Sequence, residues 1–116
     1  MPAPIVFFDI AGPDAARQTA FYRAVFGWDV GPAGQFTVSV PAAGLPATLR
    51  ADPADKVIYA GVDDVTAALA KVTANGGSVV QPRLVVKGVV VLGLFKDPAG
   101  NTMGVVEIKD GKPVVP

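Results

Sequence analysis

The sequence contains neither cysteine nor histidine. Without cysteine the chain forms no disulfide bond and has no thiolate nucleophile. Without histidine it lacks the commonest general base and the commonest transition-metal ligand, which excludes a serine–histidine hydrolase triad. Acid–base chemistry in this chain would need another residue type, and the candidates are Asp9 and Tyr59.

The chain also lacks a charge excess and a long apolar segment. Ten basic and ten acidic residues balance, and no cluster of lysine and arginine indicates nucleic acid or an anionic membrane as a partner. No stretch reaches the roughly 18 apolar residues that a membrane span needs, and the amino terminus lacks the basic segment of a signal peptide. We therefore expect a cytoplasmic protein with no nucleic acid and no membrane partner.

Apolar residues are abundant, since 51% of the 116 residues are hydrophobic and only 17% are charged. This size and composition are typical of one globular domain that buries its own core. Because small monomers seldom expose large apolar patches, the high apolar content also indicates that part of the surface is buried against a partner. We therefore expect a homodimer.

Alternating, β-branched and aromatic segments predict strands, and glycine, proline and aspartate mark where they end. In the first half we expect a strand at 5–10, a helix at 15–26, and strands at 28–30, 35–40 and 47–50. In the second half we expect a strand at 56–62, a helix between 64 and 75, strands at 78–86, 89–96 and 102–108, and a loose tail at 109–116. Phe21 and Tyr22 of the first helix are expected to be core residues.

The order of these elements repeats, because a strand, a helix and three strands occur twice. The first helix begins at Asp14 and ends at Gly27, and the second helix does the same 50 residues later, at Asp64 and Gly77. This order predicts one α+β domain, residues 1–116, made of two βαβββ modules. Repeat 1 spans about 4–52, repeat 2 spans about 55–108, and a carboxyl-terminal tail follows.

Alternation along each strand assigns side chains to the two faces of a sheet. In the first strand Phe7 and Asp9 are expected on the face opposite the helix, and in the fifth strand Val57 and Tyr59 take the corresponding positions. Two such curved sheets set edge to edge would enclose a cup lined by these faces. A cup of this kind is a natural site for a small molecule.

Three segments resemble the vicinal oxygen chelate superfamily, which includes glyoxalases, bleomycin resistance proteins and dioxygenases. Residues 14–28, read as D-x-x-x-x-x-x-F-Y-x-x-x-F-G-W, resemble its first helix, and Val62-Asp63-Asp64 fits the junction that opens its second helix. Residues 97–107, D-P-A-G-N followed by T-M-G-V-V-E, resemble its final turn and strand. The resemblance covers nearly the whole chain and implies the paired-module, glyoxalase-like fold.

Members of this superfamily commonly hold a divalent metal in the cup. The resemblance implies one ligand on the first strand, one on the fifth and a glutamate on the last, and these positions are Phe7, Val57 and Gly104. None of the three side chains can bind a metal. A further ligand position near 47–51 has no carboxylate before Asp52. We therefore predict no metal and no cofactor.

Ten residues are candidates for lining the cup. They are Phe7, Asp9, Thr37, Ser39, Arg50, Val57, Tyr59, Arg83, Thr102 and Gly104. Asp9 is either a buried base or a strand-end aspartate that backbone donors satisfy. Arg50 and Arg83 either hold a ligand carboxylate or phosphate or are solvated edge residues. Tyr59 either donates a hydrogen bond to a ligand or fills the cup as an aromatic wall.

Two other residues have alternative interpretations. Glu107 would reach the metal position only if the register slipped by three residues, which also reverses its face, so we expect it to face the helix or solvent. Trp28 either stacks on a planar ligand or packs in the core or a dimer contact.

These features favour a protein that binds a small organic ligand in a metal-free cup. The bleomycin resistance branch shows by resemblance that such a module can sequester a molecule without chemistry. The alternatives are a metal-dependent lyase, isomerase or dioxygenase of the same superfamily, and a structural or regulatory partner without a small ligand. The sequence leaves open whether the protein is an enzyme and assigns no catalytic residue.

Overall fold

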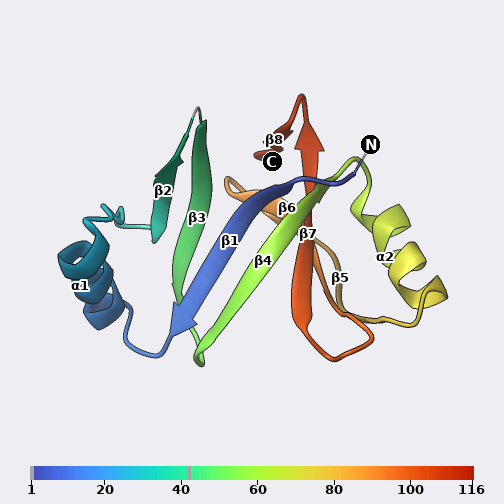
Figure 1. The fold of residues 1–116 in the computed structure, drawn as a ribbon, viewed down its shortest axis with the longest axis horizontal. Helices are drawn as coiled ribbons and strands as arrows, with labels where there is room; N and C mark the ends of the chain where they lie inside the picture. Colours follow the sequence, from blue (N-terminus) through green and yellow to red (C-terminus); the bar gives the residue numbers. More distant parts are fainter. Residues whose placement is uncertain (1, 42) are drawn as a thin grey trace. The chain divides into compact units, whose positions relative to one another are not determined.

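The fold was obtained as a computed structural model that describes residues 2–41 and 43–116 (Figure 1). The elements are β1 (Ile5–Gly12), α1 (Ala15–Phe26), β2 (Gln35–Val40), β3 (Ala43–Ala51), β4 (Asp55–Val62), α2 (Val65–Ala74), β5 (Ser78–Val86), β6 (Val90–Lys96), β7 (Thr102–Lys109) and β8 (Lys112–Pro113). The predicted α+β class is confirmed. Neither helix in the described ranges is long and apolar enough to cross a membrane.

The chain forms two compact units. The N-terminal unit holds Phe8–Val57, and the C-terminal unit holds Ile58–Pro116 together with the start of β1 up to Phe7. The helices and the strands before them keep the predicted 50-residue offset, since β1 and β4 begin at Ile5 and Asp55. The compact units nevertheless differ from the predicted repeats, because β1 and β4 each contribute residues to both.

In the N-terminal unit the strand order is β2, β3, β1. β1 runs parallel to β3, with Phe8 opposite Ala47, and β2 runs antiparallel to β3, with Phe36 opposite the same alanine. The two phenylalanines pack around the small Ala47 side chain, with ring centroids 5.8 Å apart. Leu49 and Val30 complete this buried cluster.

Helix α1 covers one face of these strands. Asp14 caps its start by accepting a hydrogen bond from the Arg17 N–H at 3.0 Å, and Gly27 ends it in the left-handed conformation with φ of 69°. Left-handed backbone favours glycine because it carries no Cβ. The carboxyl-terminal half of α1 packs through Tyr22, which stacks on Trp28 with ring centroids 5.2 Å apart.

Two predictions for this region are wrong. Residues 28–30 form no strand, so two strands instead of three follow α1 in this unit. The turn lies after this segment, since the Gly31 N–H donates to the Gln35 carbonyl and the Gly34 N–H donates to the Gly31 carbonyl. Phe21 is not a core residue, because its side chain is 54% exposed. It lies one position, about 100°, around the helix from Tyr22, and only the Tyr22 side meets the strands.

The C-terminal unit has the predicted βαβββ order, with the strands arranged β4, β7, β6, β5. β4 and β7 are parallel and the other pairs are antiparallel. Part of the predicted loose tail is ordered, because β8 pairs with the end of β7 and the Val114 N–H donates to the Glu107 carbonyl at 2.9 Å.

Helix α2 packs closely on this unit. Val65 and Leu69 are 0% and 5% exposed and form a cluster with Val105. Gly93 lies beneath them, where an added Cβ would be 2.8 Å from Leu69 and 2.9 Å from Val65. The close approach of α2 to β6 therefore requires a residue without a side chain at position 93.

Candidate functional site

The ten residues predicted to line a cup divide between the two units. The N-terminal unit holds Asp9, Thr37, Ser39, Arg50 and Val57, and the C-terminal unit holds Phe7, Tyr59, Arg83, Thr102 and Gly104.

In the N-terminal unit the sheet face opposite α1 is polar. Asp9 and Gln35 both lie opposite Thr48 in the strand register, and paired residues point to the same face. Alternation adds further residues of the same strands to this face. We call it the polar face and define it by Asp9, Gln35, Thr37, Ser39, Thr48 and Arg50. Four predicted site residues therefore share one surface.

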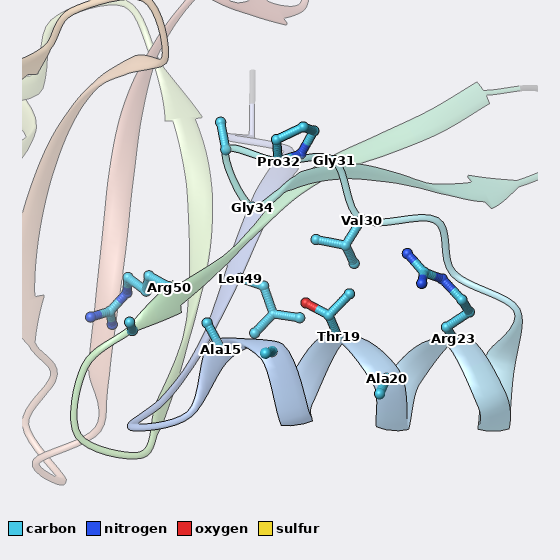
Figure 2. Close-up of a pocket in the computed structure, with 13 residues that line it drawn as sticks. Ala15, Thr19, Ala20, Arg23, Val30, Gly31, Pro32, Gly34, Leu49 and Arg50 are labelled. Atoms are coloured by element: carbon cyan, nitrogen blue, oxygen red, sulfur yellow. The ribbon is translucent and has the colours of Figure 1, made fainter.

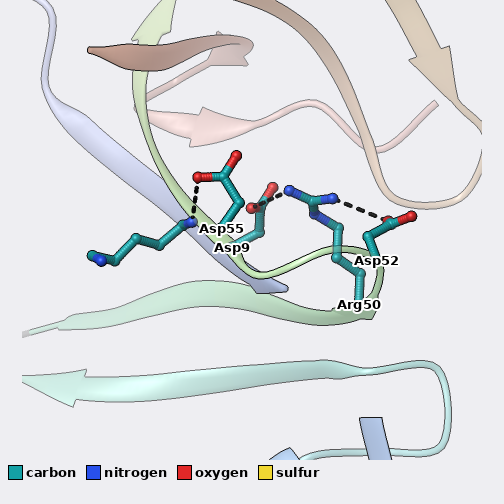
Figure 3. Close-up of polar contacts among 5 residues, drawn as sticks. Asp9, Arg50, Asp52 and Asp55 are labelled. Atoms are coloured by element: carbon teal, nitrogen blue, oxygen red, sulfur yellow. Dashed lines mark hydrogen bonds and ion pairs between the residues drawn. The ribbon is translucent and has the colours of Figure 1, made fainter. Parts of the chain in front are cut away.

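Asp9 is the buried group of this face, with 4% exposure. The Arg50 guanidinium donates from Nη2 to Asp9 Oδ1 at 3.2 Å and from Nη1 to Asp52 Oδ2 at 3.0 Å (Figure 3). A buried carboxylate is costly unless a charged or polar partner satisfies it, and here the partner is an arginine. Asp9 also lies within β1, so its placement at a strand end is wrong.

Arg50 is held in place and still reaches solvent. Its side chain is 36% exposed, whereas that of Asp52 is 54% exposed. Two carboxylates fix the orientation of the planar guanidinium fork, and such a fork binds oxygen atoms of a ligand with defined geometry. Sequence reasoning missed Asp52 as a partner, although its position two residues from Arg50 was a usable signal.

In the C-terminal unit the predicted site residues Phe7 and Tyr59 are aromatic and tightly packed. Phe7 and Tyr59 are 5% and 2% exposed, and their rings meet edge to face with centroids 5.3 Å apart. Tyr59 lies opposite Gly104 in the β4–β7 register, and a Cβ at Gly104 would clash with the Tyr59 ring. Tyr59 therefore occupies the space into which a side chain at position 104 would extend.

This packing bears on a metal centre of the superfamily type. The three positions implied for ligands carry Phe7, Val57 and Gly104, and Val57 is 2% exposed. The repeat offset relates Asp9 to Tyr59, so Thr48, the register partner of Asp9, is the counterpart of Gly104. Throughout residues 2–41 and 43–116 no three side chains of histidine, cysteine, aspartate or glutamate come together. The residues present do not fit such a metal.

Glu107 and Arg83 form a separate ion pair. Arg83 donates to Glu107 from Nε at 2.8 Å and from Nη2 at 3.1 Å, and the Val65 N–H at the start of α2 donates to Glu107 at 3.4 Å. The hydrogen bonds from Arg83 lower the pKa of Glu107, and the hydrogen bond to Glu107 raises the pKa of Arg83. The prediction that Glu107 faces the helix is confirmed.

The prediction that Arg83 lines a cup is wrong, because Arg83 lies on the α2 side of its sheet with Glu107. The β5–β6 register shifts between Val79 and Gln81 and again between Gln81 and Leu84. Such shifts break the alternation of faces, so period-2 reasoning fails there. Thr102 begins β7 and shares the face of Gly104 by alternation.

Comparison with known proteins identifies relatives that match most of the chain. A family model described as a glyoxalase-like domain matches residues 5–106. The anthracycline biosynthesis protein DnrV of Streptomyces peucetius is 28% identical over 128 aligned residues, covering 90% of this chain and 46% of that protein. The anthracycline biosynthesis protein DauV of Streptomyces sp. (strain C5) is 27% identical with the same coverage. The chain spans about half the length of these curated relatives.

Solved structures share the fold. A methylmalonyl-CoA epimerase in complex with methylmalonyl-CoA and NH4+ superposes with a TM-score of 0.69 at 17% identity, covering 97% of this chain and 99% of that chain. A single-substitution variant of the Streptomyces coelicolor methylmalonyl-CoA epimerase, in complex with 2-nitronate-propionyl-CoA, gives 0.67 at 18% identity, with the same coverage. These matches show the glyoxalase-like fold.

Proposed function

The chain belongs to the glyoxalase-like domain family, and from that premise we propose that it binds a small organic molecule, without a metal, on the polar face. One observation carries the proposal: the Arg50 guanidinium is fixed by Asp9 and Asp52 and remains partly exposed. A preoriented donor pair of this kind loses little conformational freedom when it binds an oxygen-rich ligand.

The ligand class that we propose is a planar aromatic molecule with keto or phenolic oxygens. The curated relatives are anthracycline biosynthesis proteins, which supports an aromatic ligand of this general type. Arg50 donates to a carbonyl or phenolate oxygen with its fork. The exposed hydroxyl groups of Thr37 and Ser39, on the same face, add shorter-range hydrogen bonds.

The biological role in this proposal is sequestration or presentation of the ligand, as in the bleomycin resistance branch. A homodimer and a cytoplasmic location are parts of the same proposal. Three apolar side chains of α1 that remain about half exposed, Phe21, Val25 and Phe26, support a contact between copies. Light scattering after size-exclusion chromatography tests the homodimer, and cell fractionation tests the location.

A second candidate is a metal-independent enzyme that uses Asp9 as a base. The position of Asp9 supports it, because its carboxylate lies on the polar face beside the Arg50 guanidinium that would hold the ligand. Such an enzyme would exchange an acidic C–H proton of its ligand with solvent. Incubation of a bound keto compound in deuterium oxide, followed by mass spectrometry, separates this candidate from a pure binding protein.

The binding proposal is tested by calorimetric titration with 1,4-dihydroxyanthraquinone. We expect saturable binding to the wild type, and the Arg50→Ala variant should bind at least tenfold more weakly, which corresponds to about 1.4 kcal/mol. Arg50→Lys keeps the charge without the fork and should give an intermediate affinity. The matched control is Arg17→Ala, an exposed arginine on α1 that should leave the affinity unchanged.

Two results would count against this proposal. Equal binding by the wild type and Arg50→Ala would place the ligand away from the polar face. The complete absence of binding by anthraquinones and small keto acids would favour a structural or regulatory protein.

A further inference from the structure

A hollow of about 740 Å³ lies between α1, the segment 30–34 and the end of β3 in the N-terminal unit (Figure 2). Its floor is formed by Val30 and Leu49, one wall by Ala15 and Thr19, and its rim includes Arg23 and Pro32. Leu49 belongs to the cluster that packs against α1, so the hollow lies on the opposite side of the strands from the polar face. We call it the α1 hollow.

The repeat explains why this space is open. At the 50-residue offset, Ala15 and Thr19 of α1 correspond to Val65 and Leu69 of α2. In α2 these two side chains are almost fully buried and fill the space between the helix and its strands. In α1 the same positions carry shorter side chains, and no residue of the helix is buried.

The large apolar side chains of α1 do not compensate. Phe21, Val25 and Phe26 are 54%, 54% and 60% exposed, so they point away from the hollow. The helix is held at its carboxyl-terminal half by the stack of Tyr22 on Trp28. The side of α1 from Ala15 to Arg23 borders the hollow, which is open to solvent and leaves apolar atoms of Val30 and Leu49 available to a ligand.

The chemistry of the lining indicates what would bind. The volume falls within the roughly 300–1,000 Å³ typical of small-molecule sites. Among the described residues that line the hollow none is acidic, and the charged ones are Arg23 and Arg50. Arg23 is 58% exposed and lies 3.8 Å from the Asp29 carboxylate, which is itself 98% exposed and therefore binds it weakly. An apolar floor with a cationic rim complements an apolar anion.

We infer that the α1 hollow is a second binding site, for a small aromatic molecule that carries one carboxylate or sulfonate group. The aromatic part contacts Val30 and Leu49 in place of the side chains that α1 lacks, and the anionic group pairs with Arg23. Arg50 touches both sites, but Val30, Leu49 and Arg23 do not belong to the polar face. The inference therefore does not depend on the function proposed above.

The test uses 8-anilino-1-naphthalenesulfonate, an aromatic anion whose fluorescence rises in apolar surroundings. The wild type should bind one molecule per chain. The double variant Ala15→Val, Thr19→Leu gives α1 the side chains of α2, and it should raise the melting temperature and weaken the probe at least tenfold. Arg23→Gln, which leaves the packing unchanged, should weaken the probe about three- to tenfold.

Two control variants separate the hollow from the rest of the helix. Ala24→Val introduces a β-branched residue on α1 outside the hollow, and Phe21→Ser removes an exposed aromatic side chain. Both should leave probe binding unchanged. The inference is overturned if the filled variant gains stability and still binds the probe as the wild type does. Loss of binding in Phe21→Ser, or displacement of the probe as protein concentration rises, would also overturn it. If the filled variant fails to fold, an Arg23→Gln variant that binds the probe with unchanged affinity overturns the inference.

Discussion

At the scale of single residues, the pair of Tyr59 and Gly104 determines what the C-terminal unit can hold. The superfamily resemblance places a glutamate ligand at position 104, where this chain has no side chain. The Tyr59 ring fills the space above Gly104 and packs edge to face on Phe7. The absence of a side chain at position 104 and the aromatic ring at position 59 are therefore two parts of one steric arrangement.

This arrangement predicts a strong coupling between the two positions. Gly104→Ala should destabilise the protein by about 1–3 kcal/mol, because the new methyl group overlaps a ring that is 2% exposed. The same substitution made in a Tyr59→Ala background should cost much less. Urea denaturation of the four proteins of this double-mutant cycle measures the coupling. Additive effects would show that the ring does not occupy this space.

The Glu107–Arg83 pair predicts a pH dependence. The hydrogen bonds from Arg83 lower the folded-state pKa of Glu107 below its unfolded value. Its contribution to stability is therefore fully present above about pH 4.3, the ordinary glutamate pKa, and is lost as pH falls through the lowered folded-state pKa. The difference in denaturation midpoint between the wild type and Glu107→Gln should shrink as pH falls from 6 to 3. A constant difference would contradict the ion pair.

Residue types and alternation predicted part of the candidate site. Alternation places Asp9, Thr37, Ser39 and Arg50 on one face, as the strand register confirms. The contact between Asp9 and Arg50 was not predictable, because they lie 41 residues apart in sequence and meet only through the parallel register of β1 and β3. Local patterns carry no information about which strands become neighbours.

At the scale of elements, helices and their caps were the most predictable features. Asp14 and Asp64 cap both helices with 3.0 Å hydrogen bonds, as their sequence positions indicate. The segment 28–30 shows the limit, since its apolar residues look like a short strand. Its backbone is irregular instead, while Trp28 and Val30 pack their side chains in the core. Side-chain burial and strand pairing are separate properties.

The aromatic residues at the end of α1 therefore differ in how much they contribute to stability. Trp28 stacks on Tyr22 and lies 5.1 Å from the Phe36 ring centroid, whereas Phe21 is 54% exposed. Trp28→Ala should cost about 2–4 kcal/mol, and Phe21→Ala should cost about 1 kcal/mol or less. Thermal or chemical denaturation of both variants measures the contrast. Equal losses would mean that Phe21 is buried after all.

At the scale of the whole molecule, the repeated strand–helix pair at a 50-residue offset is the property that the sequence predicted best. The order of elements needs only local signals, and the 50-residue offset gives an independent check on them. The two units have nevertheless diverged in packing. In the C-terminal unit β5, β6 and β7 follow a helix whose contact is filled, whereas in the N-terminal unit β2 and β3 follow a helix that borders a hollow.

The central claim is that a glyoxalase-like chain binds its ligand without a metal. The most direct measurement is the titration of 1,4-dihydroxyanthraquinone into protein dialysed against a strong chelator, compared with the same protein incubated with zinc, manganese, nickel or iron and then freed of unbound metal, which the hydroxyquinone would itself chelate. We predict the same affinity and stoichiometry in every condition, together with less than one metal ion per ten chains by elemental analysis. Binding that disappears after chelation and returns with one divalent metal would contradict the claim.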